Sequence, residues 1–223
     1  MNKITVAIDG PAGAGKSSVA KLVANRLNYL YIDTGAMYRA FTWAMVDRHI
    51  DIADTVAVAG LVRDLQIRLE AGETGCRVYV DGREVTDKIR KPAVSSRVSP
   101  VAALAVVREK LVQLQRSMAA PGGVILDGRD IGTVVLPQAD LKIYLTASVE
   151  SRAKRRYLEQ KEKGGNETLE DIAANIAARD DMDSHRDVSP LKQAEDAVLV
   201  DNSQIDLQET ADLIAAMIEE KAR

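Results

Sequence analysis

The segment Gly10-Pro11-Ala12-Gly13-Ala14-Gly15-Lys16-Ser17 follows a short apolar stretch, Thr5–Ile8, and leads into an amphipathic stretch, Ser17–Leu27. It matches the pattern G-x-x-x-x-G-K-[ST] at every fixed position, between a predicted strand and a predicted helix. Glycines let the backbone curl so that its N–H groups and the helix N-terminus face a phosphate, while Lys16 neutralises charge and the Ser17 hydroxyl can bind Mg²⁺. The segment therefore predicts a phosphate site built as strand, loop and helix.

Further along the chain, other short apolar stretches are separated by helical patterns. They are Tyr29–Ile32, Val124–Leu126, Leu141–Leu145 and Ala197–Val200. Parallel strands that are buried on both faces have this nearly continuous apolar character. We therefore expect an α/β fold, a P-loop three-layer sandwich with a central parallel sheet.

A different sequence pattern is found between the second and third of the predicted parallel strands. Leu65–Leu69 and Arg77–Val80 alternate apolar and polar residues, and Asp81-Gly82 is a dipeptide typical of hairpin turns. This pattern predicts a small antiparallel insertion. The tract Gln160–Thr168 contains Gly164-Gly165, so we expect a mobile flap there.

Composition and charge limit the possible functions. The formal net charge is −3, which argues against a global basic field of the kind that binds nucleic acid. The single cysteine, Cys76, and the two distant histidines, His49 and His185, suggest no metal cluster. The longest apolar run, Val101–Val107, is far short of a membrane span, and the N-terminus has no signal-peptide layout. We expect a cytoplasmic protein with no membrane partner.

Polar residues stand at the ends of two predicted strands, where open α/β sheets bind their ligands. Asp33-Thr34 opens a segment that ends at Arg39, and Asp127-Gly128-Arg129-Asp130 follows the strand Val124–Leu126. At these positions Arg39 can bind an acceptor phosphate, and Asp127 can bind Mg²⁺ or its water ligands. Arg129 would lie beside the path of phosphoryl transfer. The alternatives are a helix cap at Asp33 or Thr34 followed by a surface arginine, and a solvated turn after the strand Val124–Leu126.

Arginines cluster in two later segments. Arg152, Arg155 and Arg156 share one face of a predicted helix, and Arg179 and Arg186 follow the glycine-bearing tract. Such a face is often only solvated. However, an enzyme that holds several negative charges in its site needs guanidinium groups that make bidentate contacts, and the arginines of these two segments can supply them.

The phosphate-binding pattern alone does not separate kinases from GTPase switches or ATP-driven motors. The chain has no Asn-Lys-x-Asp segment of the kind that reads guanine, and no extra modules of a motor. We therefore predict a kinase that transfers the terminal phosphoryl group of ATP to a small molecule. A kinase for UMP or another metabolite, and a nucleotide-sensing module whose arginines bind a protein, stay open on this reasoning.

The motifs GPAGAGKS, DTGAMYR, VSPVA ahead of VRE, DGRDIGTVV, KIYLTA and RDDMDSHRDVSPL together closely resemble those of the bacterial cytidylate kinases, nearly from end to end. The resemblance implies transfer from ATP to CMP, and to dCMP, with Mg²⁺ and without a covalent enzyme intermediate. It also implies a monomer with one kinase domain over residues 1–223. The core would comprise 1–35, 100–150 and 187–223, the region that binds the monophosphate would be 36–99 with its β insertion at about 65–90, and the lid about 151–170.

The resemblance also assigns site residues. It implies that Ser99, Arg108 and Asp130 read the cytosine edge and that Tyr38, Arg39 and Arg129 surround the acceptor phosphate. Thr34 is a further residue expected to bind substrate. Arg179, Asp183 and Arg186 would contact sugar and phosphate. The groups expected to stabilise charge during transfer are Lys16, Arg129, Arg155, Arg156 and Arg186.

One departure from the family pattern concerns the residues after the loop lysine. The family often has Gly-Thr there, whereas this chain has Ser17-Ser18. Either hydroxyl can meet Mg²⁺, so the departure changes little. Ser17 and Ser18 both join the residues expected to bind ATP, and the residues expected to bind Mg²⁺ are Ser17 and Asp127, directly or through water.

Overall fold

The computed structural model describes residues 2–72, 75–162 and 164–223. The chain forms two compact units, Met1–Tyr29 with Gly122–Arg223, and Leu30–Pro121. Glu73 and Thr74 of the predicted β insertion and Lys163 of the predicted lid lie outside the described residues.

The first unit contains a parallel sheet whose strands run in the order β6-β1-β7-β8. The strands are β1 (Thr5–Asp9), β6 (Val124–Gly128), β7 (Leu141–Thr146) and β8 (Val198–Asp201). β1 is flanked on both sides, and its residues Val6, Ala7 and Ile8 are fully buried. The loop after β1 therefore leaves from the interior of the sheet, at the same edge as the ends of β6 and β7.

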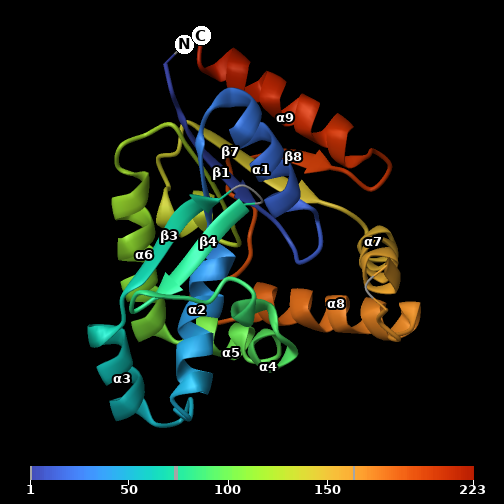
Figure 1. The fold of residues 1–223 in the computed structure, drawn as a ribbon. Helices are drawn as coiled ribbons and strands as arrows, with labels where there is room; N and C mark the ends of the chain where they lie inside the picture. The colour runs from blue at the N-terminus through green and yellow to red at the C-terminus, as the bar shows by residue number, and fades with distance from the viewer. Residues whose placement is uncertain (1, 73–74, 163) are drawn as a thin grey trace. The chain divides into compact units, whose positions relative to one another are not determined.

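Helices surround these strands. They are α1 (Lys16–Leu27), α7 (Val149–Glu162), α8 (Leu169–His185) and α9 (Leu207–Lys221), with a π-helical turn η2 at Ile131–Val135. α1 packs against α9 and β6. α7 and α8 lie side by side through a small core that includes Ala153, Ile172 and Ile176 (Figure 1).

The loop between β1 and α1 depends on glycine at specific positions. Gly10 has φ of 148°, and a Cβ built on it would lie 1.9 Å from the carbonyl oxygen of Leu145 on β7. Gly15, the residue before α1, has φ of 87°, in the left-handed region that glycine adopts without strain. The chain can therefore turn tightly against β7 and enter α1 within a few residues only because these side chains are absent.

The second unit begins with β2 (Leu30–Asp33) and α2 (Thr34–Asp47), and continues through α3 (Thr55–Asp64). Next comes an antiparallel sheet, β3-β4-β5, formed by Ile67–Gly72, Gly75–Val80 and Arg83–Glu84. The turn residues Asp81 and Gly82 have φ of 48° and 80°, as a tight hairpin requires. The remaining elements are η1 (Lys88–Arg90), α4 (Pro92–Ser95), α5 (Val98–Ala103) and α6 (Ala105–Ala119).

These elements confirm the strands, the first helix and the antiparallel insertion that the sequence pattern predicts. The sequence pattern does not predict the π-helical turn η2, because no break separates its apolar segment, Ile131–Val135, from the motif Asp127–Asp130. Within the described ranges, no helix is long and apolar enough to cross a bilayer.

Helix α9 begins with a capping box that allows a test of the fold. The Asp206 side chain accepts the N–H of Glu209 at 2.8 Å, and the Glu209 carboxylate accepts the N–H of Asp206 at 2.8 Å. We expect Asp206→Ala to lower the free energy of unfolding by about 1 kcal/mol, because a backbone donor at the helix start loses its acceptor. Urea denaturation measures this change.

Asp212→Ala is the matched control on the same helix. Asp212 pairs with Arg26, and both side chains are 54% exposed, so the change should cost less than about 0.5 kcal/mol. Equal losses in the two variants would contradict the capping argument.

Candidate active site

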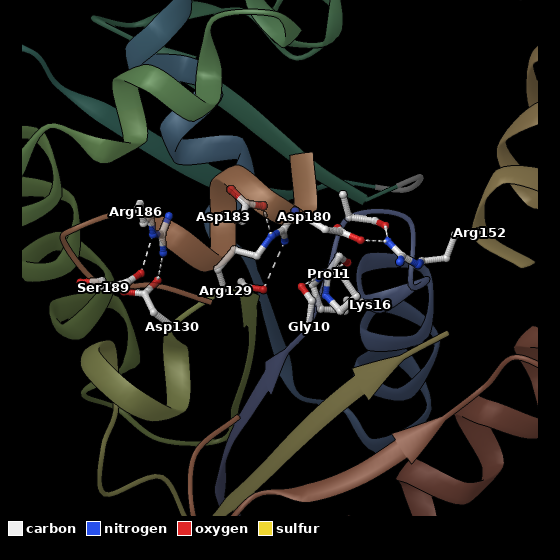
Figure 2. Close-up of polar contacts among 12 residues, drawn as sticks. Gly10, Pro11, Lys16, Arg129, Asp130, Arg152, Asp180, Asp183, Arg186 and Ser189 are labelled. Atoms are coloured by element: carbon white, nitrogen blue, oxygen red, sulfur yellow. Dashed lines mark hydrogen bonds and ion pairs between the residues drawn. The ribbon is translucent and has the colours of Figure 1, made fainter. Parts of the chain in front are cut away.

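The phosphate-binding loop surrounds the ammonium group of Lys16. Lys16 is only 5% exposed, and its Nζ donates to the carbonyl oxygens of Gly10 and Pro11, each at 2.7 Å (Figure 2). The cation is thus held at the centre of the loop by the loop's own backbone. An ammonium group placed there can meet the oxygens of a bound phosphate after a small change of partner.

A hydroxyl and a carboxylate meet beside this loop. Ser17, in the first turn of α1, donates its hydroxyl to Asp127 Oδ2 at 2.7 Å, and Asp127 lies at the end of β6 with 4% exposure. Hard oxygen ligands of this kind suit Mg²⁺, which commonly keeps several waters and takes only one or two protein ligands. Within the described residues there is no group of three or more His, Cys, Asp or Glu side chains that could hold a metal by itself. The pair therefore fits Mg²⁺ bound together with phosphate. Ser18, the next residue along α1, is exposed.

Asp9 is a second buried carboxylate at this edge of the sheet. It ends β1, and its two oxygens accept the backbone N–H groups of Ile131 at 2.8 Å and Gly132 at 2.7 Å. Burial raises the pKa of the Asp9 carboxyl to about 6, although both backbone hydrogen bonds act in the opposite direction. Asp9 is not among the residues that the sequence motifs indicate.

Two ion pairs connect the motif at the end of β6 with the last turn of α8 and with Arg186, the residue after it. Arg129 donates through Nε to Asp183 Oδ2 at 2.7 Å and through a terminal nitrogen to the carbonyl of Gly128 at 3.3 Å. Arg186 lies 3.6 Å from Asp130 Oδ1 and donates to the carbonyl of Ser189 at 2.5 Å (Figure 2). The structure therefore brings together Arg129, Asp130, Asp183 and Arg186, which sequence analysis named from distant segments.

Positive groups crowd around the phosphate-binding loop. Burial, followed by the neighbouring charge of Arg129, lowers the pKa of Lys16 well below its usual value, and Asp127 and Asp9 oppose this only in part. Burial and then Arg129 also lower the pKa of Arg179. Within the part of the chain that the structure describes, the buried Nε of Arg179 makes no hydrogen bond. A bound anion would favour the charged forms of both groups.

The arginines of α7 point to different partners. Arg152 is buried, donates to the carbonyls of Ala12 at 2.9 Å and Ala147 at 2.8 Å, and pairs with Asp180 at 2.6 Å (Figure 2). The helical spacing puts Arg152 on the arginine-bearing face of α7, but Arg152 is not among the predicted site residues. Its position just after the end of β7, at the edge where the loop lies, is the signal that could have identified it.

The two arginines of α7 that were named as candidates make other contacts. Arg155 donates to the side-chain oxygen of Asn202 at 3.1 Å and to its carbonyl at 2.5 Å. Asn202 in turn donates to the carbonyl of Ala14 at 3.0 Å, so Arg155 is linked to the phosphate-binding loop through one residue. Arg156 is exposed and lies 3.5 Å from Glu159 on its own helix.

The second unit holds the other candidate residues. Arg108 on α6 is 2% exposed, with its guanidinium 5.4 Å from the centre of the Tyr38 ring and a hydrogen bond to the carbonyl of Ala102 at 3.2 Å. Arg39 donates to Ser95 Oγ at 2.8 Å. Ser99 lies on α5 and is partly exposed.

The start of α2 explains the polar residues after β2. The Asp33 carboxylate accepts the N–H of Ala36 at 2.8 Å and so caps the helix, and it also lies 3.1 Å from Arg90. The capping alternative is therefore correct for Asp33. Thr34 is the first residue of α2 and is buried.

The parallel sheet, the loop after its inner strand β1 and the acidic residue ending the neighbouring strand define a P-loop fold of the kinase type. Two solved structures share it. An uncharacterised protein from Eubacterium ventriosum matches with a TM-score of 0.53 at 13% identity, over 98% of this chain and 99% of that one. A shikimate kinase from Bacteroides thetaiotaomicron matches with a TM-score of 0.50 at 11% identity, over 97% and 98% of the two chains. These likenesses concern the fold alone.

Sequence comparison then identifies the family. A family model described as cytidylate kinase matches residues 6–220. The chain is 48% identical to a cytidylate kinase of Bacillus subtilis, over 99% of both chains, and 50% identical to one of Lactobacillus gasseri, over 98% of this chain and 95% of that one. The chain belongs to the cytidylate kinase family, as the resemblance of its motifs indicates.

The buried pair Arg152–Asp180 provides a test of how the loop is supported. We expect Arg152→Ala to lower the free energy of unfolding by about 3 kcal/mol, since it leaves Asp180 without its cation and the Ala12 carbonyl without its donor. The double variant Arg152→Met/Asp180→Leu should recover much of this loss, because it removes both charges. Chemical denaturation of all three proteins gives the values.

Arg156→Ala is the control one turn further along α7. Its pair with Glu159 is about 60% exposed on both sides, so the change should cost less than about 0.5 kcal/mol. A double variant that is no more stable than Arg152→Ala would contradict the role of the buried charge pair.

Proposed function

We propose that this chain transfers the γ-phosphoryl group of ATP to CMP, and also to dCMP, giving ADP and CDP or dCDP. The observation that carries the proposal is the group of cations around the phosphate-binding loop. Lys16 is buried there, and burial together with the neighbouring charges of Arg129 and Arg179 lowers its pKa. Such a group favours ligands that bring several negative charges. Membership of the cytidylate kinase family supports ATP as donor and CMP as acceptor.

The donor side of the reaction uses the loop from Gly10 to Ser18. Its members are Gly10, Pro11, Ala12, Gly13, Ala14, Gly15, Lys16, Ser17 and Ser18. Backbone N–H groups and the start of α1 receive the phosphates, and Lys16 exchanges its two carbonyl partners for phosphate oxygens. Ser17 and Asp127 would hold Mg²⁺, directly or through water, and the ion supplies neutralisation of the phosphate charge when it is bound.

The acceptor side uses the residues that the family resemblance assigns. Tyr38, Arg39 and Arg129 serve the acceptor phosphate, and Thr34 is a further substrate-binding residue. Arg179, Asp183 and Arg186 contact sugar and phosphate. Ion pairing to Asp183 fixes the direction of Arg129, and bidentate arginines placed in this way stabilise the charge that spreads over the transferring group.

The choice of cytosine follows from hydrogen-bond chemistry. Cytosine presents an amino donor next to a ring acceptor and a carbonyl acceptor, so a carboxylate and an arginine complement it, whereas uracil replaces the amino donor with an acceptor. We assign these roles to Asp130 and Arg108, with Ser99 as a further polar contact. A site built around a hydrogen bond penalises the analogue that cannot form it far more than an apolar pocket would.

Catalysis is then positioning and charge stabilisation, without a covalent intermediate. Lys16, Arg129 and Arg186 act at the transferring group, and Arg155 and Arg156 join them from the lid, about residues 151–170. Lid closure would exclude water and so suppress hydrolysis of ATP. We propose that the enzyme works as a cytoplasmic monomer whose core, monophosphate-binding region and lid have the boundaries expected from the sequence.

Acceptor-dependent formation of ADP tests the proposal. A coupled assay across CMP, dCMP, UMP and AMP should show turnover that depends on the acceptor and is fastest with CMP or dCMP. Slow hydrolysis of ATP that ignores every monophosphate would instead indicate a nucleotide-sensing module. Preference for another acceptor would indicate a kinase with different specificity.

Lys16→Met probes the donor side. We expect kcat to fall by roughly 10²- to 10³-fold, as on loss of one preorganised electrostatic contact, while the melting temperature is kept because methionine retains the buried stem. Lys221→Ala, which removes an exposed lysine at the end of α9, is the control and should leave kcat unchanged. Near-normal turnover by a folded Lys16→Met protein would rule out this mechanism.

Asp130→Ala and Arg108→Ala probe base recognition. Each should lower kcat/KM for CMP and narrow the ratio of kcat/KM for CMP to that for UMP, by about tenfold for each hydrogen bond lost. Steady-state kinetics with both acceptors measure the ratio. A ratio unchanged in both variants would show that cytosine is recognised by other residues.

A further inference from the structure

Among the acidic side chains at the carboxyl edge of the parallel sheet, Asp9 has a contact pattern of its own. Asp127 accepts the hydroxyl of Ser17, whereas Asp9 accepts two consecutive backbone N–H groups, from Ile131 and Gly132. Asp9 is 5% exposed, so these contacts are made away from water. A buried carboxylate whose two oxygens both accept backbone donors fixes the position of that backbone closely.

The backbone held in this way follows directly after the acceptor-side motif. Ile131 and Gly132 begin the π-helical turn η2, and Arg129 and Asp130 immediately precede them. The carbonyl of Asp130 accepts the N–H groups of Val134 and Val135, so the turn closes back on the same residue. Along the chain, Arg129 and Asp130 are therefore held on both sides. The strand β6 precedes them, and Ile131 and Gly132, which donate to Asp9, follow them.

Packing leaves little freedom at this contact. A Cβ built on Gly132 would lie 3.0 Å from Cδ of Lys142 and 3.4 Å from Oδ2 of Asp9. Lys142 is itself held by hydrogen bonds to the carbonyl of Pro137 at 2.7 Å and to Asp196 at 2.9 Å. The backbone of Gly132 can approach Asp9 closely because residue 132 has no side chain.

We propose that Asp9 is a positioning residue that sets the place of Arg129 and Asp130, two of the acceptor-side residues of the first unit, relative to the phosphate-binding loop. The role rests on the proposed function. Through its main chain Asp9 joins Gly10 and so begins the donor loop, and through its side chain it holds the start of η2. One residue thereby links the donor and acceptor sides of the first unit.

Asp9→Asn is the direct test because it changes one acceptor atom into a donor. The amide can accept from only one of the two N–H groups, and its NH₂ then opposes the other. We expect KM for CMP to rise about tenfold and kcat to fall, since one buried hydrogen bond is lost and the loop shifts, while KM for ATP stays within about twofold. A general loss of stability would not raise KM for CMP while leaving KM for ATP nearly unchanged.

The other end of β1 offers a matched control. Asp140 accepts the N–H of Thr5 at 2.7 Å, so it also binds a backbone donor of β1, but it is exposed and lies outside the proposed site. Asp140→Asn should leave both KM values and kcat as in the parent protein.

Gly132→Ala perturbs the same contact from the opposite side and serves if Asp9→Asn does not fold. It should also raise KM for CMP more than KM for ATP, and the double variant should cost less than the sum of the two single changes, because both disturb one interaction. Melting temperatures confirm that each protein is folded.

The outcomes separate this role from the proposed function. A parent protein without CMP-dependent turnover would overturn the proposed function and this role with it. A parent protein that does phosphorylate CMP, with Asp9→Asn and Gly132→Ala proteins equal to it, would overturn the positioning role alone. An equal rise in KM for ATP and CMP would also overturn it, because Asp9 would then support the donor loop.

Discussion

The close approach of Gly10 to β7 is the constraint on which the site of the first unit depends. A side chain at this position would overlap the carbonyl of Leu145, so only glycine lets the chain leave β1 where it does. From that point the loop can wrap around the ammonium group of Lys16 and deliver Ser17 next to Asp127. Moving the loop outward would separate the hydroxyl from the carboxylate and leave the buried lysine without its carbonyl partners.

Around this loop, buried charges are arranged in pairs that each connect two segments. Arg152 joins the loop to α8 through Ala12 and Asp180, and Arg129 joins the end of β6 to α8 through Asp183. Isolated buried charges would be costly, and pairing lowers that cost without removing it. Burial and the charge of Arg129 lower the pKa of both Lys16 and Arg179, so part of this cost remains despite the pairing. An anionic substrate would relieve it, so substrate binding and local electrostatics are coupled.

Much of the fold could be predicted because its signals are local. The loop pattern, the short apolar strands and the Asp81-Gly82 turn each need only a few neighbouring residues to be recognised. The contacts of Arg155, Arg152 and Asp9 could not be predicted in the same way. Each depends on backbone atoms from a distant segment, and a spacing of arginines on a helix face does not tell which guanidinium turns toward Asn202 and which toward the loop. The family resemblance indicates the acceptor residues. Only the structure shows that Arg129 pairs with Asp183 and that Arg186 pairs with Asp130.

The hydrogen bonds of Lys16 to the Gly10 and Pro11 carbonyls also affect how binding constants should be interpreted. When a phosphate enters the loop, the ammonium group does not come from water, because it already has protein partners. Binding is therefore an exchange of acceptors, and the measured affinity reports the difference between phosphate oxygens and two backbone carbonyls. An exchange of this kind limits how tightly the products are held, which favours their release after each turnover.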